Sequence, residues 1–294
     1  MTSALVPRWS DPELRSAIEN HYDGLVDLYE KVWGEHIHHG YWAEDSPADR
    51  HAAQVRLIEK LIEFGKVPTG ARVLDAGCGV GASSVYLAAN HGATVEGITL
   101  AAEQVRRGGE KKAEAGVADR VNFQIMDALH TDFPDDSFDV VWALESCELM
   151  PDKERFLSEC HRVLKPGGTL VVATWCARDN DLDDSEHRLL GRIHRDFVIS
   201  HVLPLPDYHA MAERLGFTDV RSDDWSERVT DTWKMSSDLV KPIIKDPTVV
   251  WKLVRAKGVD IFRFLNSVPL MRQAYDRGVM HYGVFTGTKA GGHQ

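Results

Sequence analysis

Three glycines at alternate positions follow a short apolar run, and this arrangement limits the possible folds more than any other feature of the sequence. The run at 73–76 predicts a strand, and Gly77, Gly79 and Gly81 predict a turn directly after it. Glycine permits positive φ and leaves the main chain bare, so a ligand can touch the backbone of such a turn. Segment 82–89 predicts a helix whose first N–H groups can meet a carboxylate or a phosphate.

Asp75 distinguishes this turn from a dinucleotide-binding site. The spacing is Gly-x-Gly-x-Gly, whereas dinucleotide sites have Gly-x-Gly-x-x-Gly and an acid that closes the second strand, where this sequence has Thr99. An acid at the carboxyl end of the first strand repels a diphosphate and attracts an ammonium group. The residues favour a ligand with both an ammonium and a carboxylate, such as S-adenosylmethionine (SAM). An NAD-dependent oxidoreductase is the alternative from another enzyme class.

The order of apolar runs predicts an α/β fold. We expect a Rossmann-like, doubly wound sheet of seven mainly parallel strands with a helical cap. Strands are expected near 72–76, 94–98, 121–125, 138–143, 168–174, 218–222 and 282–289. Helical segments between the first five strands make those strands parallel, which places the ligand crevice at their carboxyl ends.

Four segments are expected along the chain. Residues 1–65 would form an N-terminal helical lid, 66–180 the SAM-binding core, 181–275 the sixth strand with a helical substrate cap, and 276–294 the closing strand and tail. Helices are expected at 11–65 (the second of them at 49–64), 185–202 and 207–215. Apolar residues within 227–276 recur at helical intervals, so we expect this segment to cover the substrate. A pair of plain packing helices would show the same periodicity.

Further motifs make the sequence resemble the class I SAM-dependent methyltransferases. In the family order, these motifs occupy 94–100 with a later Gln104, 121–128, 138–146 and 161–168. The resemblance is good over residues 15–180. A closer similarity, to the gamma-tocopherol methyltransferase-like group, rests on Tyr22-Asp and on segments 33–41, 145–152, 174–176 and 224–227. That group includes enzymes that methylate carbon in prenylated aromatics and enzymes that methylate nitrogen in indole alkaloids.

This resemblance implies a set of cofactor contacts. The expected residues are Asp75, Gly77, Gly79 and Gly81 at the amino-acid end of SAM, Thr99, Leu100 and Gln104 near the ribose, Asp127 and Ala128 at the adenine, and Leu144 on the strand that leads to the reaction site. Many relatives have an acid at the ribose, where this sequence has none.

Two residues are expected to be catalytic. Glu148 follows the fourth strand, and shielding from water would raise its pKa so that it could accept a proton; a solvated or helix-capping acid is the simpler alternative. Related tocopherol enzymes commonly have histidine where this sequence has Leu149, so no role is carried over from it. Glu145 is expected to support the adenosine side. Tyr22 is the candidate lid residue, with a core tyrosine as its alternative.

Aromatic and imidazole side chains are the candidates for acceptor binding. The expected substrate residues are His39, Tyr41, Trp175, Tyr208 and Trp225, and Trp233 is a further candidate wall. Packing in the core or the cap is the alternative for at least half of these aromatics. His36, His38 and His39 lack accompanying ligands at a convincing spacing, so no metal site is expected.

These residues predict a SAM-dependent small-molecule methyltransferase that acts on carbon of a lipophilic prenylated aromatic, indole or terpenoid. Methylation of nitrogen or oxygen in an alkaloid or other secondary metabolite is the close alternative, and a non-catalytic SAM-binding regulator belongs to another class. The net charge of −11 argues against nucleic acid as a partner. The four cysteines are scattered, and the sequence has no signal-like or membrane-spanning stretch, so we expect a cytoplasmic protein. A homo-oligomer is compatible with this sequence.

Overall fold

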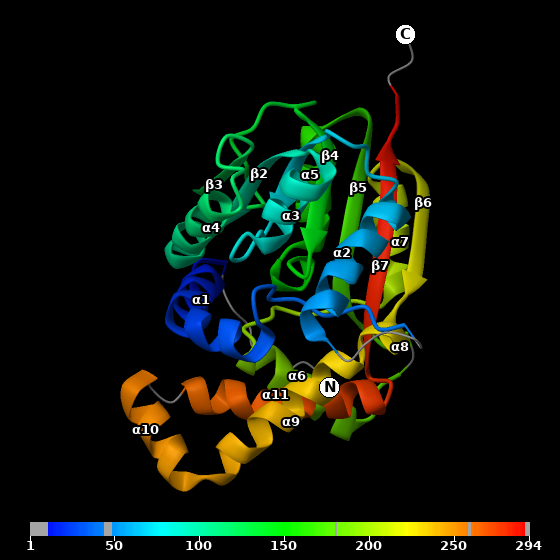
Figure 1. Ribbon diagram of the computed structural model, residues 1–294. Helices are drawn as coiled ribbons and strands as arrows, with labels where there is room; N and C mark the ends of the chain where they lie inside the picture. Colours follow the sequence, from blue (N-terminus) through cyan, green and yellow to red (C-terminus); the bar gives the residue numbers. More distant parts are fainter. Residues whose placement is uncertain (1–10, 44–48, 180, 258–259, 292–294) are drawn as a thin grey trace.

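The computed structural model describes residues 11–43, 49–179, 181–257 and 260–291. One seven-stranded sheet runs through the molecule in the order β3-β2-β1-β4-β5-β7-β6 (Figure 1). Its strands are β1 (Arg72–Ala76), β2 (Thr94–Thr99), β3 (Val121–Ile125), β4 (Phe138–Leu144), β5 (Leu164–Ala177), β6 (Phe217–Asp224) and β7 (Met280–Lys289). Strand β7 is antiparallel to both of its neighbours, and the other pairings are parallel. The expected α/β, Rossmann-like fold is confirmed.

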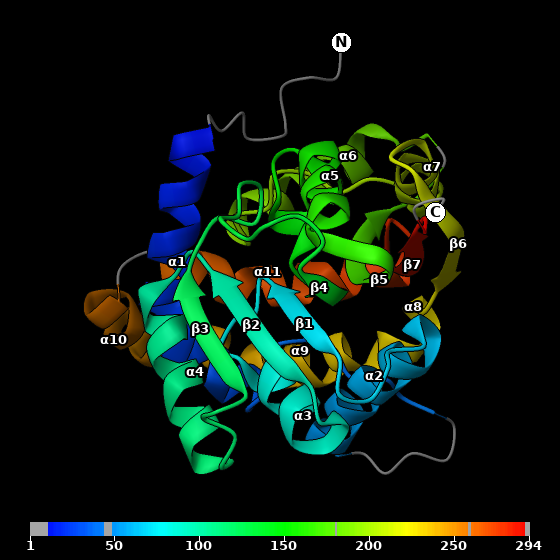
Figure 2. The same cartoon turned by 90° about the horizontal axis from the view of Figure 1, so that it is seen from above.

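Helices cover both faces of this sheet and the carboxyl ends of its parallel strands. They are α1 (Asp11–Trp33), α2 (Arg50–Gly65), α3 (Ala82–His91), α4 (Ala102–Glu114), α5 (Lys153–Val163), α6 (Asp184–Asp196), α7 (Leu205–Arg214), α8 (Ser226–Val229), α9 (Asp231–Lys245), α10 (Pro247–Lys257), α11 (Asp260–Asp276) and a short 3₁₀ turn, η1 (Cys147–Leu149). Figure 2 shows α2, α3 and α4 on one face, with α5 and α7 on the other. The cap helices α9–α11 lie below the strand ends in Figure 1.

Apolar periodicity explains how the covering helices attach to the sheet. On α2, Leu57, Ile58 and Leu61 lie on one helical face, are at most 1 % exposed, and pack in the same core cluster as Val171 of β5. On the opposite sheet face, Phe156 and Leu157 of α5 are completely buried. Helix α2 therefore belongs to the sheet layers, so of the described helices in the expected lid segment 1–65, only α1 lies at the strand ends.

The predicted helix at 185–202 ends earlier than the apolar pattern suggested. Helix α6 begins with a capping box between Asp183 and Glu186 and stops at Asp196. Val198 then has a positive φ of 56°, which an α-helix does not permit. Ile199 and Val202, beyond it, are buried in an irregular segment instead of a helix. Burial alone produces the same apolar pattern as a helix, so the sequence could not separate the two.

None of the described helices is both long enough and apolar enough to span a membrane.

Candidate active site

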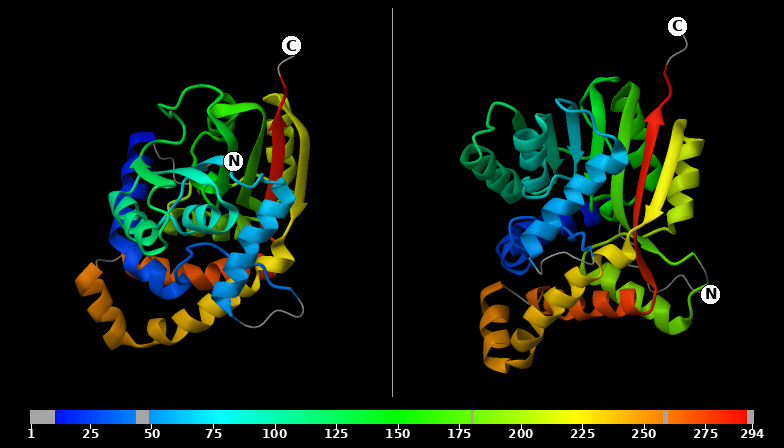
Figure 3. Two further views of the ribbon diagram at one scale, coloured as in Figure 1. Left: turned by 45° about the horizontal axis from the view of Figure 1, so that its top comes forward. Right: turned by 45° about the vertical axis from the view of Figure 1, so that its right-hand side comes forward.

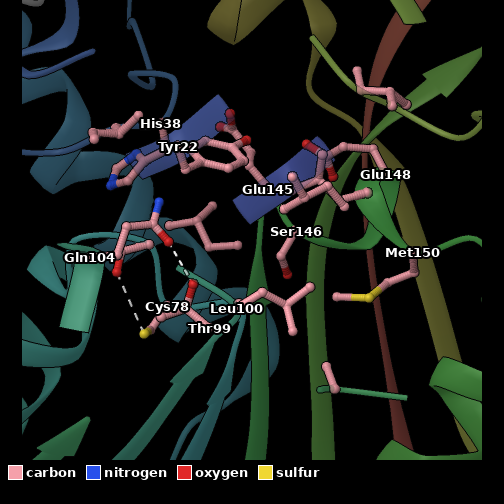
Figure 4. Close-up of a pocket in the computed structure, with 18 of the residues that line it drawn as sticks. Tyr22, His38, Cys78, Thr99, Leu100, Gln104, Glu145, Ser146, Glu148 and Met150 are labelled. Atoms are coloured by element: carbon pink, nitrogen blue, oxygen red, sulfur yellow. Dashed lines mark hydrogen bonds between the residues drawn. The ribbon is translucent and has the colours of Figure 1, made fainter. Parts of the chain in front are cut away.

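A cavity of about 410 Å³ opens at the carboxyl ends of β1, β2 and β4. This volume lies within the range of small-molecule sites. In the close-up of Figure 4, Thr99, Leu100 and Gln104 lie at one side of the cavity, and Tyr22, Glu145 and Glu148 lie across from them. The cavity therefore joins the glycine turn to a region that carries two carboxylates.

The glycine turn brings bare backbone to the cavity wall. Gly77 has φ of 93°, and a Cβ built on it would lie 2.3 Å from Cβ of Ser146. The Ser146 hydroxyl donates to the carbonyl of Ala76 at 2.5 Å, which fixes that neighbour in place. Gly79 also lines the cavity, with φ of 52° and open space where a Cβ would lie. This cradle fits a ligand that needs close contact with the main chain.

Asp75 and Gly81 do not line the cavity but lie behind its wall, and their expected cofactor contacts stay predictions. Asp75 is 1 % exposed, and its carboxylate accepts hydrogen bonds from the hydroxyls of Ser84 at 2.5 Å and Ser83 at 3.3 Å. Burial raises its pKa to about 6. Gly81 starts α3 and packs against the ring of Phe123. Both residues therefore support the glycine turn on the side away from the cavity. The glycine turn itself and the first turn of helix α3 separate them from the cavity.

The expected ribose and adenine residues do line the cavity. The Thr99 hydroxyl donates to Oε1 of Gln104 at 2.5 Å, so these two side chains hold each other, and Leu100 lies between them in the sequence. Asp127 accepts a hydrogen bond from the backbone N–H of Leu129 at 2.9 Å, which fixes its carboxylate. Gly77, Gly79, Ala128 and Leu144 complete the set of expected contacts that border this region. This part of the cavity fits the expected cofactor.

Glu148 is buried in η1, which follows β4, and it accepts one hydrogen bond at its side chain and one at its backbone. The Thr174 hydroxyl donates to Oε2 of Glu148 at 2.9 Å, and the Lys153 ammonium donates to its carbonyl at 3.0 Å. Burial, followed by the negative charge of Glu145, raises the pKa of Glu148 to about 8. Its carboxyl group is therefore mostly protonated at neutral pH, since neutral pH lies below that value.

Glu145 is the second buried carboxylate, and it is held differently. Its Oε1 accepts hydrogen bonds from the backbone N–H of His39 and from the hydroxyl of Tyr282, both at 2.8 Å. Burial alone would raise the pKa of Glu145, but the imidazole and the N–H of His39 outweigh burial and lower it. Glu145 also has a positive φ of 53°, a strained backbone conformation of the kind found at functional sites. Its contacts are with His39 and Tyr282, and its expected support of the adenosine side stays a prediction.

His39 and Glu145 form a close imidazole–carboxylate pair. The Nδ1 atom of His39 lies 2.9 Å from Oε2 of Glu145. Both ring nitrogens of His39 are buried, and neither makes a hydrogen bond of suitable geometry among the described residues. His39 lines the cavity, as expected for a substrate-binding residue. The pair therefore places an imidazole, which can accept a proton, beside a carboxylate that can stabilise the resulting positive charge.

Tyr22 of α1 lines the cavity beside the two carboxylates (Figure 4). Burial, together with the charges of Glu148 and Glu145, raises the pKa of the Tyr22 hydroxyl above its ordinary value. The phenol therefore keeps its proton and can act as a hydrogen-bond donor.

Aromatic side chains form the wall of the cavity away from the glycine turn. Trp175 of β5 and Trp233 of α9 meet edge to face, with ring centroids 5.7 Å apart, and Phe197 packs against both. The indole nitrogens of Trp175 and Trp233 are buried without a hydrogen-bond partner among the described residues. Trp233 is the one cavity residue contributed by the described part of the 227–276 insertion.

Three expected substrate residues lie outside this cavity. Trp225 packs edge to face against Tyr41 at 5.2 Å and against Phe64 at 5.8 Å, beside the sheet edge. Tyr208 of α7 is completely buried and stacks on Phe285 at 5.6 Å, on the opposite face of the sheet. Tyr41, Tyr208 and Trp225 thus fill packing positions, as the alternative interpretation of these aromatics expected, and no acceptor contact of theirs is seen in this cavity.

The three histidines near residue 36 face different groups, although the rings of His36 and His38 remain in contact, with centroids 5.1 Å apart. His38 faces the cavity, and its Nδ1 meets the carbonyl of His39 at 2.7 Å. His36 instead joins Glu35 and His51, and the ligand atoms of these three lie within 4.8 Å of one another. Exposed acidic groups often approach in this way without an ion, and both Glu35 and His51 are exposed.

Several cavity residues escaped the sequence interpretation. Tyr29 of α1, Phe197 and Ile199 line the cavity without having been expected there, whereas Trp33 belongs to the segment 33–41 that carries the closer resemblance. The helical pattern of α1 signalled only that Tyr29 would be buried, and Phe197 fell inside a segment expected to be a longer helix. A small-residue turn or a cluster of polar residues near these positions would have been needed to indicate a site.

Comparisons with known proteins agree with this geometry. The family described as "Methyltransferase domain" matches residues 74–172. The probable tocopherol O-methyltransferase, chloroplastic, of Oryza sativa subsp. japonica is 38% identical over 292 residues, which cover 94% of this chain and 78% of that protein. The tocopherol O-methyltransferase, chloroplastic, of Arabidopsis thaliana is 34% identical and covers 94% of this chain and 83% of that protein. The crystal structure of the [4+2]-cyclase SpnF has a TM-score of 0.82 and 26% identity, and covers 95% of this chain and 97% of its own.

Proposed function

This chain belongs to the tocopherol methyltransferase-like group of class I SAM-dependent methyltransferases, and we propose that it methylates a carbon atom of a lipophilic acceptor in secondary metabolism. It is an enzyme, and its cofactor is SAM. The proposed acceptors are a prenylated aromatic, an indole or a terpenoid. Relatives named as tocopherol methyltransferases support a lipophilic acceptor with an aromatic ring.

One observation carries this proposal: the glycine turn and the aromatic wall belong to a single cavity. Gly77 and Gly79 border its cofactor side, while Trp175 and Trp233 border the other side. Aromatic faces stabilise positive charge and exclude water. A carbon nucleophile that gains a methyl group becomes cationic before it loses a proton, so such walls suit methylation of carbon.

The backbone of Gly77 and Gly79 and the side chains of Gln104 and Asp127 would hold the cofactor. When bound, SAM supplies an electrophilic methyl group on a sulfonium. Thr99 keeps Gln104 in place through its hydrogen bond, so this side of the cavity is ordered before any ligand enters. Alignment of the two reactants then supplies much of the rate enhancement.

We assign the proton acceptor to the His39–Glu145 pair. Methylation of an aromatic carbon releases one proton, from that carbon or from a hydroxyl group that activates the ring. His39 lines the cavity, neither of its ring nitrogens is hydrogen-bonded among the described residues, and its Nδ1 lies 2.9 Å from Oε2 of Glu145. The proton passes to Nε2, and the nearby Glu145 carboxylate stabilises the imidazolium that forms.

Glu148 takes a different role because its carboxyl group is mostly protonated at neutral pH. A neutral carboxylic acid donates a hydrogen bond, and an acceptor oxygen or nitrogen is the natural partner. Above its pKa of about 8 the same group becomes a second candidate base. Tyr22, which keeps its proton, donates from the side of α1.

Methylation of nitrogen or oxygen is the alternative within the same chemistry. The relatives from rice and Arabidopsis are named O-methyltransferases, and the His39–Glu145 pair would serve a hydroxyl acceptor equally well. The family assignment leaves no support for an NAD-dependent oxidoreductase or for a regulator that only binds SAM. Likeness to a cyclase shows that this fold also supports other reactions.

A cytoplasmic location is also proposed, and it rests on the cysteines. Cys78, Cys147, Cys160 and Cys176 are all free and buried, as is usual in a reducing compartment.

Incubation with methyl-labelled SAM and a panel of tocopherol precursors, indoles, terpenoids and alkaloids tests the proposal. We expect label in a carbon–carbon bond of the product, together with S-adenosylhomocysteine. Label recovered solely on nitrogen or oxygen would refute the carbon assignment. Titration calorimetry with SAM and with NAD provides a separate check of the cofactor, and binding of NAD without SAM would overturn the methyltransferase assignment itself.

A further inference from the structure

Large exposed apolar side chains gather on one helical hairpin. Within the described ranges, four such side chains are exposed, and three of them, Leu239, Val249 and Trp251, belong to α9 and α10. Trp251 is 58% exposed, the largest fraction of the four. Single exposed apolar residues are common, but a cluster of them marks a surface that contacts something apolar.

The position of α10 explains why the protein does not bury these side chains. Figures 1 and 3 show α10 projecting from the cap, with α9 and α11 as its neighbours. Val249 and Trp251 are separated by about 200° around the helix, because each residue advances the direction by about 100°. One neighbouring helix face therefore cannot cover both of them, and both are exposed.

This hairpin is also basic within an acidic protein. Helices α9 and α10, residues 231–257, contain six cations, Lys234, Lys241, Lys245, Lys252, Arg255 and Lys257, and three acids, Asp231, Asp238 and Asp246, whereas the whole chain has a net charge of −11. Lys241 pairs with Asp238 at 3.2 Å, so Lys245 and Arg255 are the cations on which the argument rests. The side chains of Lys241, Lys245 and Arg255 are exposed. The Arg255 guanidinium lies over the ring of Trp251, 5.1 Å from its centroid. Tryptophan combined with basic residues is typical of helices that lie in a membrane interface.

We propose that the α9–α10 hairpin docks on an anionic lipid surface. Trp251 and Val249 would enter the boundary between headgroups and acyl chains, while Lys245 and Arg255 would meet lipid phosphates. A second copy of this chain is the competing occupant. A symmetric dimer through this hairpin would place its basic residues against the same residues of the partner, and like charges repel. Charge complementarity therefore favours the lipid.

The same helix connects this surface with the cavity. Trp233, near the start of α9, lines the cavity, and Lys245 ends α9 at the exposed hairpin. A lipophilic acceptor dissolves in membranes, so docking would hold the enzyme where the acceptor is concentrated. This functional reading rests on the proposed function, whereas lipid binding itself is measured without an acceptor and can fail or succeed independently.

Co-sedimentation of the full chain with vesicles tests the proposal. We expect binding to vesicles of phosphatidylcholine mixed with phosphatidylglycerol, weakened by salt, and much weaker binding to pure phosphatidylcholine. Each of the substitutions Lys245→Gln and Arg255→Gln should lower binding about five-fold. Trp251→Ser should lower it at least as much. When vesicles are added, the tryptophan emission of the parent protein should shift to shorter wavelength, and that of the Trp251→Ser variant should not.

Two variants serve as matched controls. Ile125→Ser removes the fourth exposed apolar side chain, which lies at the end of β3, and Lys60→Gln removes an exposed cation on α2. Both should bind anionic vesicles like the parent. Equal loss in these controls, equal binding to neutral vesicles, or no vesicle binding would overturn the proposal. A dimer in analytical ultracentrifugation that Trp251→Ser converts to a monomer would assign the hairpin to self-association instead.

Discussion

Glu145 and Glu148 enter one cavity, yet their environments move their pKa values in opposite directions. His39 lowers the pKa of Glu145 against the effect of burial, whereas burial and the charge of Glu145 raise that of Glu148 to about 8. Two nearby carboxylates cannot easily be ionised together in a site shielded from water. The pair therefore divides into a carboxylate that supports His39 and a neutral acid, which is a common basis for acid–base chemistry.

The substitution Glu148→Gln should make the protein more stable at alkaline pH. The pKa of Glu148 rises from 4.5 to about 8 on folding, so the folded state binds the proton more tightly. Stability is therefore lost as pH rises from about 4.5 through about 8, by a few kcal/mol in total. A glutamine has no such penalty. Thermal unfolding should show the variant several degrees above the parent at pH 8.5, and the difference should shrink towards pH 5.

Activity of the same variant tests the role assigned to Glu148. A glutamine amide can donate a hydrogen bond in place of the carboxylic acid, so Glu148→Gln should keep more of the kcat at pH 7 than Glu148→Ala does. If both variants lose activity equally while remaining folded, Glu148 acts as a base in its ionised form. The stability profile and the kcat thus separate the two roles.

Removing the imidazole of His39 should affect the chemical step and leave cofactor binding intact. General acid–base catalysis contributes about 10²- to 10⁴-fold, so His39→Gln should lower kcat by about 10²-fold or more. The dissociation constant for SAM, measured by calorimetry, should stay within about threefold of the parent value, because the cofactor side of the cavity is formed by other residues.

His38→Gln is the matched control for His39. His38 also lines the cavity, but it has no contact with Glu145 comparable to the 2.9 Å pair of His39. Its kcat should fall much less. Equal losses in the two variants would mean that imidazoles shape this wall without accepting the proton, and the assignment of the base would return to Glu148.

The fold was predictable because its signals are local and repeated. The apolar run 73–76 and the glycines after it define one strand and turn without reference to distant residues, and the following strands repeat the pattern. Pairing of β5 with β7 joins residues such as Val171 and Thr286, and sequence alone indicated such a closing strand only through its β-like composition. Helix α6 was overextended because a buried turn and a helix share apolar spacing.

The site residues were predictable where the backbone conformation requires a particular residue, and less predictable where side-chain packing determines which residues line the cavity. Gly77 and Gly79 face the cavity because the turn needs glycine there, and Glu148 follows β4 into the crevice. Aromatic residues carry no such signal. Trp175 lines the cavity while Trp225 packs at the sheet edge, although both are buried tryptophans next to strands. The Glu145–His39 contact joins residues 106 positions apart, so no local pattern contains it.

Substitutions of these tryptophans should separate acceptor binding from packing. Trp175→Leu should raise the KM for the acceptor by about tenfold, because one large cavity contact is lost, while the SAM dissociation constant changes little. Trp225→Phe keeps an aromatic ring against Tyr41 but loses the indole hydrogen bond to Asp223. It should lower the melting temperature and leave the acceptor KM unchanged. An increase of KM in Trp225→Phe would place the acceptor outside the described cavity.

Two alanine substitutions in the glycine turn should have different consequences. At Gly81, φ is 78° and a Cβ would lie 2.3 Å from the ring of Phe123, so Gly81→Ala should cost about 3 kcal/mol in the free energy of unfolding through backbone strain and overpacking.

At Gly79, φ is 52° and the space is open, so strain alone costs about 1 kcal/mol. Because Gly79 lines the cavity, Gly79→Ala should instead weaken SAM binding by about tenfold or more. Denaturant unfolding without ligand and calorimetry with SAM measure the two effects separately. Equal stability losses together with unchanged SAM affinity in Gly79→Ala would contradict close contact between the cofactor and this turn.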